Sequence, residues 1–242
     1  MAEAPPGEYD SENESESDTR IYRNKIIKYF QVNEMYNRRQ NRFLRITYLY
    51  YRLKLYSWTT YPEDESSRSN ELFNSTAEHA EVTLVRELEH ELNSFTADEE
   101  MEYAMQHLTL ESPADDHHGY SKDKKKKMTL KIVLNYAPCK GCADTIIQFK
   151  QNFENNYEMH IMITFASFYL FYPSDDQNQN ILGLANLKNA GIKLRLVWDS
   201  KSFERIVKNI GTEEERMKRQ AIDRKYMEIV NRKTKEIADN MV

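Results

Sequence analysis

The stretch TLKIVLNYAPCKGC, residues 129–142, decides the fold of this chain. Its first half, 129–135, is apolar and β-branched and predicts a short buried strand that ends before Pro138. Four apolar residues then recur at helical spacing, so they share one face and predict a helix. They are Cys142, Ile146, Phe149 and Phe153. A strand that leads directly into an amphipathic helix indicates an α/β architecture.

Further strands and helices alternate along the chain. β-branched, aromatic and alternating apolar residues predict strands. These strands are expected at 43–56, leading into a second strand, at 159–166 and at 192–198, with a turn at 66–70. Helical spacing predicts helices at 22–36, 181–189, 200–210 and 212–239, and one whose first turn contains His79 and Glu81. This alternation predicts an α/β sandwich.

Composition suggests the domain boundaries. Residues 1–20 hold seven carboxylates and one arginine, and they are expected to form a disordered acidic tail. Residues 21–242 are expected to form a single domain. Within it, 93–127 is interpreted as a long, mostly mobile insertion with an acidic helical piece, and 212–242 as a C-terminal helix. This last helix has an apolar stripe along one face, which is expected to pack on the body of the protein or on a partner. The stripe consists of Ile222, Tyr226, Ile229, Val230 and Ile237.

The net charge of −5 hides a basic segment. The tail contributes −6, so the remainder holds 33 basic and 32 acidic residues. Residues 21–56 contain nine Lys or Arg and one Glu, which favours a face that binds a polyanion. A solvated helix face explains the same charges equally well. The basic run 124–127 has the same two interpretations.

The sequence also favours a cellular compartment. It shows no basic and apolar leader and no apolar run of about 18 residues, so neither secretion nor membrane spanning is expected. Two cysteines spaced three apart cannot form a disulfide framework, which favours the reducing cytoplasm or nucleus. No pattern predicts an oligomeric state.

The two cysteines suggest a metal centre. Cys139 and Cys142 lie at the predicted start of a helix, so both sulfurs share one face and the thiolate forms are favoured. With His79 as a neutral third ligand, they form a set that suits zinc and leaves one position open, as in catalytic sites. Water held there becomes acidic, and Glu81 can take its proton and return it to a substrate. The four residues therefore predict a zinc-activated water and a carboxylate that moves its protons, which suits a hydrolytic reaction.

The motif combination supports this interpretation. His-Ala-Glu at 79–81 with PCKGC at 138–142 matches the H-x-E and P-C-x-x-C signature of zinc nucleobase deaminases. A thioredoxin-like dithiol is the main rival, because it also lies where a strand meets a helix. The dithiol gives His79, Glu81 and Pro138 no role.

Other stretches resemble the AID/APOBEC cytidine deaminases. TYLYY at 47–51 resembles the first-strand TYLCY motif of that family, and ASFY at 166–169 resembles the end of its fourth strand. LKNAGI at 187–192 resembles the turn before its fifth strand. The resemblance covers most of residues 21–210. It implies a cytidine-deaminase-like fold, with a five-stranded mixed sheet flanked by about six helices.

The same resemblance implies substrate-binding residues. Asn74 matches an asparagine that touches the target nucleotide, Thr47 matches a pocket threonine, and Tyr169 would stack near the flipped cytosine. Where the family has Ser-Trp-Ser, this chain has NYA at 135–137, so Tyr136 would form the aromatic pocket wall. Arg45 is a candidate for binding phosphate. Each also has a purely structural alternative: Asn74 as a turn residue, Thr47 as a strand residue and Tyr169 as a core aromatic.

The predicted function is zinc-dependent deamination of cytosine to uracil in single-stranded DNA. Four alternatives stay open: RNA as substrate, free cytidine as substrate, deamination of adenine in transfer RNA, and a catalytically silent zinc protein that binds nucleic acid. Glu81 and Pro138 are separated by 56 residues, about twice the family spacing, so the insertion is expected to emerge near the active-site rim. His117 and His118 in the insertion are interpreted as a solvated pair in preference to a second metal site.

Overall fold

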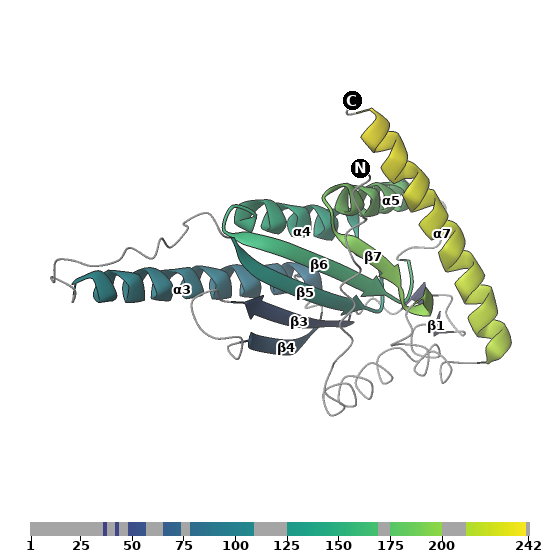
Figure 1. Ribbon diagram of the computed structural model, residues 1–242. Helices are drawn as coiled ribbons and strands as arrows, with labels where there is room; N and C mark the ends of the chain where they lie inside the picture. The colour runs from purple at the N-terminus through teal and green to yellow at the C-terminus, as the bar shows by residue number, and fades with distance from the viewer. Residues whose placement is uncertain are drawn as a thin grey trace, which may run out of the picture.

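A mixed β-sheet with helices packed beside one another forms the centre of the computed structural model (Figure 1). The structure describes residues 36–37, 42–43, 48–56, 65–73, 78–108, 125–168, 175–199 and 212–240. The acidic tail 1–20, the predicted helix at 200–210 and all but the last residue of the predicted helix at 22–36 lie outside these residues. That last residue, Tyr36, belongs to a strand.

The main sheet has the strand order β4-β3-β5-β6-β7. The strands are β3 (Tyr48–Tyr56), β4 (Glu65–Phe73), β5 (Lys126–Leu134), β6 (Tyr157–Phe165) and β7 (Lys193–Leu196). β3 is antiparallel to both β4 and β5, whereas β5, β6 and β7 are parallel. A separate antiparallel pair consists of β1 (Tyr36–Asn37) and β2 (Arg42–Phe43). The predicted turn at 66–70 is wrong, because these residues pair with β3 inside β4.

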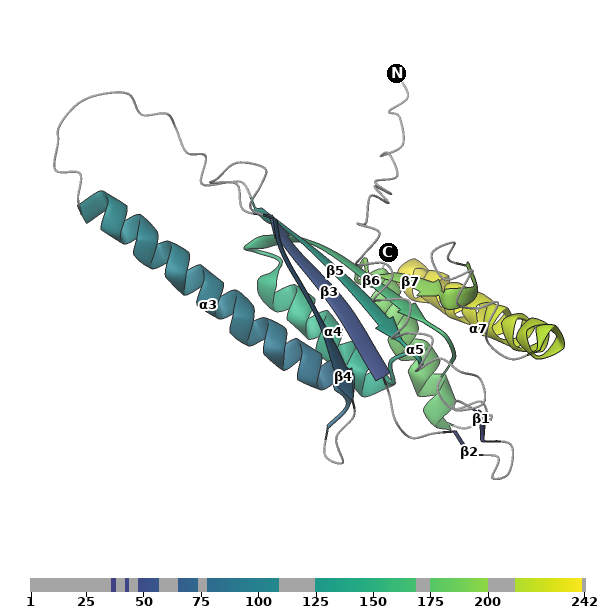
Figure 2. The same ribbon diagram turned by 90° about the horizontal axis from the view of Figure 1, so that it is seen from below.

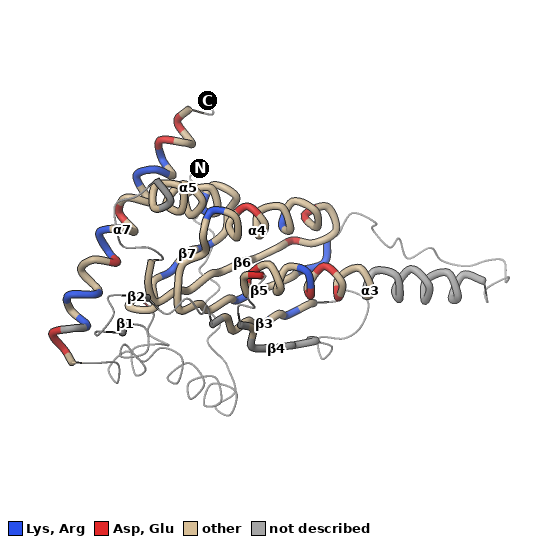
Figure 3. The backbone as a smooth tube through the Cα atoms, turned by 180° about the vertical axis from the view of Figure 1, so that it is seen from behind, with Lys and Arg blue, Asp and Glu red and all other residues tan. Residues whose placement is uncertain are grey.

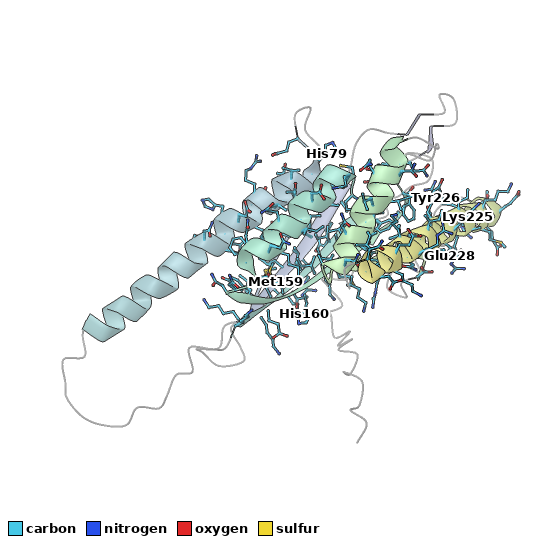
Figure 4. The ribbon with its side chains drawn as sticks, turned by 90° about the horizontal axis from the view of Figure 1, so that it is seen from above. His79, Met159, His160, Lys225, Tyr226 and Glu228 are labelled. Atoms are coloured by element: carbon cyan, nitrogen blue, oxygen red, sulfur yellow. The ribbon has the colours of Figure 1, made fainter. Side chains whose placement is uncertain are left out.

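Parallel strands require crossover connections, and here helices supply them. α4 (Lys140–Phe153) connects β5 to β6, and α5 (Asp175–Asn189) lies between β6 and β7. α3 (Ala80–Leu108) packs on α4, α4 on α5, and α5 on α7 (Glu213–Asp239). Figure 4 shows these helices side by side. The α/β class and the mixed sheet are therefore confirmed.

The core lies between the sheet and the helices. Alternate residues of β5 are buried, namely Met128, Leu130, Ile132 and Leu134, each at most 1 % exposed. Residues at helical spacing on α3 meet them, namely Leu84, Val85, Leu88 and Leu92. Burial of each such side chain contributes about 1.5–3 kcal/mol relative to exposure. The apolar run that predicted β5 and the helical spacing that predicted α3 therefore also place these residues in the core.

The insertion differs in part from its prediction: its acidic piece is helical as expected, but it belongs to α3 and is not a separate helix. Residues 93–108 continue α3, which has 29 residues and is therefore about 44 Å long at 1.5 Å per residue. Good helix formers such as Ala97, Met101 and Ala104 favour this extension. The C-terminal end of α3 and the start of β5 lie at the same end of the sheet, where α3 projects past the strands (Figure 2). The described flanks of the insertion are thus far from the start of α3 and do not lie at the active-site rim, where the insertion was expected to emerge. Residues 109–124, with His117 and His118, lie outside the described part.

α7 packs on the body with a face that the sequence predicted only in part. Val230 and Asp223 are both 0 % exposed, whereas Ile222 is 41 % exposed. The buried face therefore runs through Asp223, Tyr226, Met227 and Val230, and Ile222 does not belong to it. Lys and Arg alternate with Asp and Glu along the rest of the helix (Figure 3). None of the helices in the described ranges is long and apolar enough to cross a membrane.

The last residues of α5 and of β7 are fixed by local backbone conformation. Gly191 closes α5 with a positive φ of 77°, and its N–H bonds to the Lys188 carbonyl, as the sequence predicted. The strand predicted at 192–198 is shorter, because Val197–Asp199 form the 3₁₀ turn η1.

Candidate metal centre

Strand directions bring two distant helix starts together. β4 and β5 are both antiparallel to β3, so they run in the same direction and end at the same edge of the sheet. α3 begins shortly after β4, and α4 begins shortly after β5. The residues just before the two helices therefore meet, although about 60 positions separate them in the sequence.

His79 is the residue before α3. Its carbonyl accepts the N–H of Val82 at 3.0 Å and of Thr83 at 3.1 Å, so it occupies the N-cap position. Glu81 follows in the first turn, at the second residue of the helix. Figure 4 shows His79 at this end of α3. The predicted helix start is confirmed to within one residue.

Cys139 occupies the equivalent position before α4. Its backbone is extended, with φ −70° and ψ 169°, and its carbonyl accepts the N–H of Ala143 at 2.8 Å. Cys142 lies in the first turn and is buried, at 2 % exposed. Both sulfurs thus point to one place beside the positive end of a helix, as their spacing predicted.

The three predicted ligands form a compact triangle. The Nδ1 atom of His79 lies 3.2 Å from the Sγ of Cys142 and 3.6 Å from the Sγ of Cys139. The two sulfurs are 3.4 Å apart, too far for a disulfide bond of about 2.05 Å. Donors placed tetrahedrally at about 2.0–2.3 Å from zinc would themselves lie about 3.3–3.8 Å apart. The triangle therefore fits a zinc ion with only small shifts, and its donor atoms all lie within 4.8 Å of one another.

The two thiols shift each other's pKa in opposite directions. The hydrogen bond from Cys142 is the main cause that lowers the pKa of Cys139 to about 5, and the nearby His79 lowers it further. The same hydrogen bond, followed by burial, raises the pKa of Cys142. One sulfur thus carries a proton while the other carries a charge, and metal binding would release the remaining proton.

Glu81 is a buried carboxylate beside this triangle. It is 3 % exposed, and burial raises its pKa to about 7, helped by the charge of Cys139 and opposed by its own backbone N–H and by His79. Its Oε2 atom is buried and has no hydrogen-bond partner among the described residues. A buried acceptor without a partner costs stability, so its retention here points to a chemical role.

α5 supports the start of α4 in a way that the sequence did not reveal. The side chain of Cys139 makes no capping hydrogen bond, and Asn180 Oδ1 instead accepts the Lys140 N–H at 2.9 Å. Gly183 lies so close that an added Cβ would be 3.0 Å from the Lys140 Cα and 3.1 Å from the Ala143 Cβ. An asparagine three positions before a glycine on the partner helix is the only local signal of this support.

The predicted substrate residues are only partly described. Tyr136 follows β5 and is 1 % exposed, so it is a buried aromatic near Cys139, and its role as a pocket wall stays a prediction. Four further residues lie outside the described part of the chain, namely Arg45, Thr47, Asn74 and Tyr169. The basic segment 21–56 is described only at 36–37, 42–43 and 48–56.

A groove of about 390 Å³ runs between α3 and α4 next to His79. Its charged lining residues are Glu78, Glu89, Asp144 and Arg86, which give it a net negative charge. Arg86 is itself paired with Glu78 at 2.9 Å. A polyanion would be repelled from this side of the cluster.

The chain matches no protein-family model, and no curated protein matches it significantly. The fold nevertheless brings the predicted histidine and the two cysteines together in a cluster that can hold a metal ion and is compatible with zinc.

Proposed function

We propose that this protein is a zinc-dependent deaminase that converts cytosine to uracil in single-stranded DNA, acting in the cytoplasm or nucleus. The observation that carries the proposal is the pairing of two features. Three metal donors lie within 4.8 Å of one another, and Glu81 beside them is a buried carboxylate that does not belong to the ligand set. Structural zinc sites use four protein ligands, whereas three ligands and a free acid or base are typical of catalytic sites.

The donor set argues for zinc over other metals. Two thiolates and one imidazole are soft or borderline ligands, which suit zinc and not magnesium or calcium. A bound zinc ion would act as a Lewis acid that makes water a nucleophile near neutral pH. His79, Cys139 and Cys142 would hold it.

Glu81 would move the protons of the reaction. Water adds to C4 of cytosine, the C4–N4 bond breaks, and ammonia leaves, so cytosine and water give uracil and ammonia. Glu81 takes one proton from the attacking water and delivers it to N3 of the base, and it then carries the second proton of the water to the amino group, which leaves as ammonia. A pKa raised to about 7 suits a group that must both accept and donate a proton near neutral pH.

The substrate assignment rests on the sequence. The TYLYY and ASFY stretches favour cytosine over adenine, and the nine basic residues of 21–56 favour a polynucleotide over a free nucleoside. Arg52 and Lys54 of this segment lie on β3 and are half-buried. The acidic groove between α3 and α4 argues that the nucleic acid approaches from another side.

The test is uracil formation from single-stranded DNA oligonucleotides with varied cytosine contexts. Wild-type protein with a verified zinc content is compared with Glu81→Gln, which keeps the shape of the side chain and leaves the metal ligands intact. We expect uracil from the wild type and a loss of about 10²–10⁴-fold in the variant. Zinc content and thermal unfolding of both proteins serve as controls.

The remaining outcomes separate the alternatives. Inosine formed from transfer RNA, or uridine formed only from RNA or free cytidine, would keep the chemistry and change the substrate. A zinc-loaded, folded wild type that is inactive on all these substrates would overturn the proposal in favour of a silent nucleic-acid-binding protein. Activity retained in a verified metal-free sample would exclude the mechanism.

A further inference from the structure

One buried carboxylate of α7 joins three parts of the chain. Asp223 is 0 % exposed, and its Oδ2 atom accepts the Nε–H of Arg219 and the indole N–H of Trp198, both at 2.9 Å. Its Oδ1 atom accepts a second bond from Arg219 Nη2, also at 2.9 Å. The pair is therefore a two-pronged ion pair, which fixes the orientation of the guanidinium.

The same two side chains hold the segment that follows β6. Arg219 Nη2 donates to the hydroxyl of Ser167, and the backbone N–H of Phe168 bonds to Asp223. The Phe168 ring packs against Tyr226 of α7, with ring centres 5.4 Å apart. Ser167 and Phe168 are 1 % and 4 % exposed, so α7 is fastened to this segment inside the protein and not at its surface.

Ser167 is bonded in turn to the chain that carries a metal ligand. Its carbonyl accepts the N–H of Ala137 at 2.7 Å. Only Pro138, whose ring restricts the backbone, lies between Ala137 and Cys139. Pro138, Phe168 and Tyr226 also line one small cavity of about 10 Å³, so α7 reaches the same short segment by packing. A continuous path of contacts therefore links α7 to Cys139.

Buried ion pairs are better explained by geometry than by stability. Replacement of a buried pair by apolar residues is often neutral or stabilising, because removal of two charges from water offsets their attraction. Arg219 and Asp223 fix the position of Ser167, and an apolar pair would pack in the same place without a directed bond to its hydroxyl. Arg224, one turn further along α7, offers a contrast. It pairs with Asp199 at 3.2 Å at the surface, where both side chains are about half exposed.

We propose that Arg219 and Asp223 are positioning residues of the metal centre: through Ser167 and Ala137 they hold Cys139 where its sulfur can bind the ion. The inference rests on the metal-binding part of the proposed function and does not depend on deamination. Residues that orient the ligands of a metal site typically contribute 10–100-fold to metal affinity, and we expect an effect of this size here.

The test measures metal binding directly. Zinc affinity is measured by competition with a chromophoric chelator, and the charge-transfer bands of the Co²⁺-substituted protein report the cysteine geometry. The test variant Arg219→Met is compared with Arg224→Met, which removes the same charge from the same helix without touching Ser167. We expect about 10–100-fold weaker zinc binding and altered cobalt bands for Arg219→Met. Arg224→Met should match the wild type in both measurements.

A second variant covers the case in which Arg219→Met does not fold. Ser167→Ala leaves the ion pair intact and removes only the hydroxyl that Arg219 contacts. It should weaken zinc binding by about 10-fold, at the low end of that range, with the same change in the cobalt bands. Unchanged affinity and unchanged bands in a folded Arg219→Met or in Ser167→Ala would overturn the proposal, even if the unfolding temperature falls. These measurements need no substrate, so a protein that binds zinc normally but deaminates nothing would refute the proposed function alone.

Discussion

The Nδ1 atom of His79 lies 3.2 Å from the Sγ of Cys142, although 63 residues separate them in the chain. This contact exists because β4 and β5 run in the same direction on either side of β3 and each is followed by a helix. Its geometry suits a shared metal ion better than a bond between the two side chains, since the second sulfur is only 3.4 Å from the first.

The first prediction concerns metal content. The protein should bind one zinc ion per chain, and His79→Ala or Cys142→Ser should each lose it. Because the ion binds only the folded state, zinc at about 1,000 times its dissociation constant should stabilise folding by about 4 kcal/mol. Calorimetric unfolding with and without a chelator measures this. His90→Ala on the exposed face of α3 is the matched control and should keep the ion. Full zinc content in Cys142→Ser would refute the assigned site.

The second prediction concerns Gly183. In Gly183→Ala the new methyl group would lie 3.0 Å from the Lys140 Cα, and a backbone atom cannot move away without shifting the start of α4. We expect a net loss of about 1–2 kcal/mol in unfolding free energy, since overpacking outweighs the helix propensity gained. Zinc binding should weaken as well, because Cys139 and Cys142 flank the displaced residue.

Gly141→Ala is the control for Gly183→Ala. Gly141 lies between the two cysteines, yet an added Cβ has no atom within 4 Å. This variant should be as stable as the wild type or more stable by about 0.5–1 kcal/mol. Equal stabilities of the two variants in denaturant titrations would show that α4 and α5 do not meet as described.

The third prediction concerns the cap that α5 provides for α4. Asn180→Ala removes the acceptor of the Lys140 N–H and should cost about 1 kcal/mol, the usual value of a helix cap. Asn178→Ala, on the exposed side of the same helix, should change stability by no more than about 0.5 kcal/mol. Urea unfolding of both variants tests the difference, and a harmless Asn180→Ala would mean that water caps the helix equally well.

The fourth prediction concerns the packing of α7. Val230→Ala should cost about 2 kcal/mol, because Val230 is 0 % exposed and the variant leaves a cavity. Ile222→Ala removes a larger side chain that is 41 % exposed, and it should cost less than Val230→Ala. The reverse order in thermal unfolding would mean that the stripe expected from the sequence, with Ile222 in it, is the one that packs.

Local patterns predicted the elements that carry the site. The apolar run before Pro138 and the spacing from Cys142 to Phe153 predicted β5 and α4, and the residues at helical spacing from Leu84 to Leu92 predicted α3. The spacing of Cys139 and Cys142 within one helical turn also predicted that their sulfurs share a face. These predictions succeeded because each depends only on neighbouring residues.

Predictions that needed distant contacts were less successful. The turn expected at 66–70 is part of β4, because pairing with β3 outweighs the weak strand preference of its serines. The stripe on α7 included Ile222 and omitted Asp223, because a carboxylate is buried only when partners such as Arg219 and Trp198 satisfy it. No single-sequence pattern reveals such partners.

The sequence by itself determined the candidate residues of the site: two cysteines one helical turn apart and a histidine as metal ligands, and a glutamate two positions after the histidine as a proton carrier. Tertiary structure alone decided that His79 lies within 3.6 Å of both sulfurs and that Glu81 is buried beside them. It also decided that Asn180, Gly183 and Ser167 support the loop that carries Cys139. The physical reason is that donor chemistry and helical spacing are local properties of a chain, whereas burial and distance depend on the directions of β3, β4 and β5 in the assembled sheet.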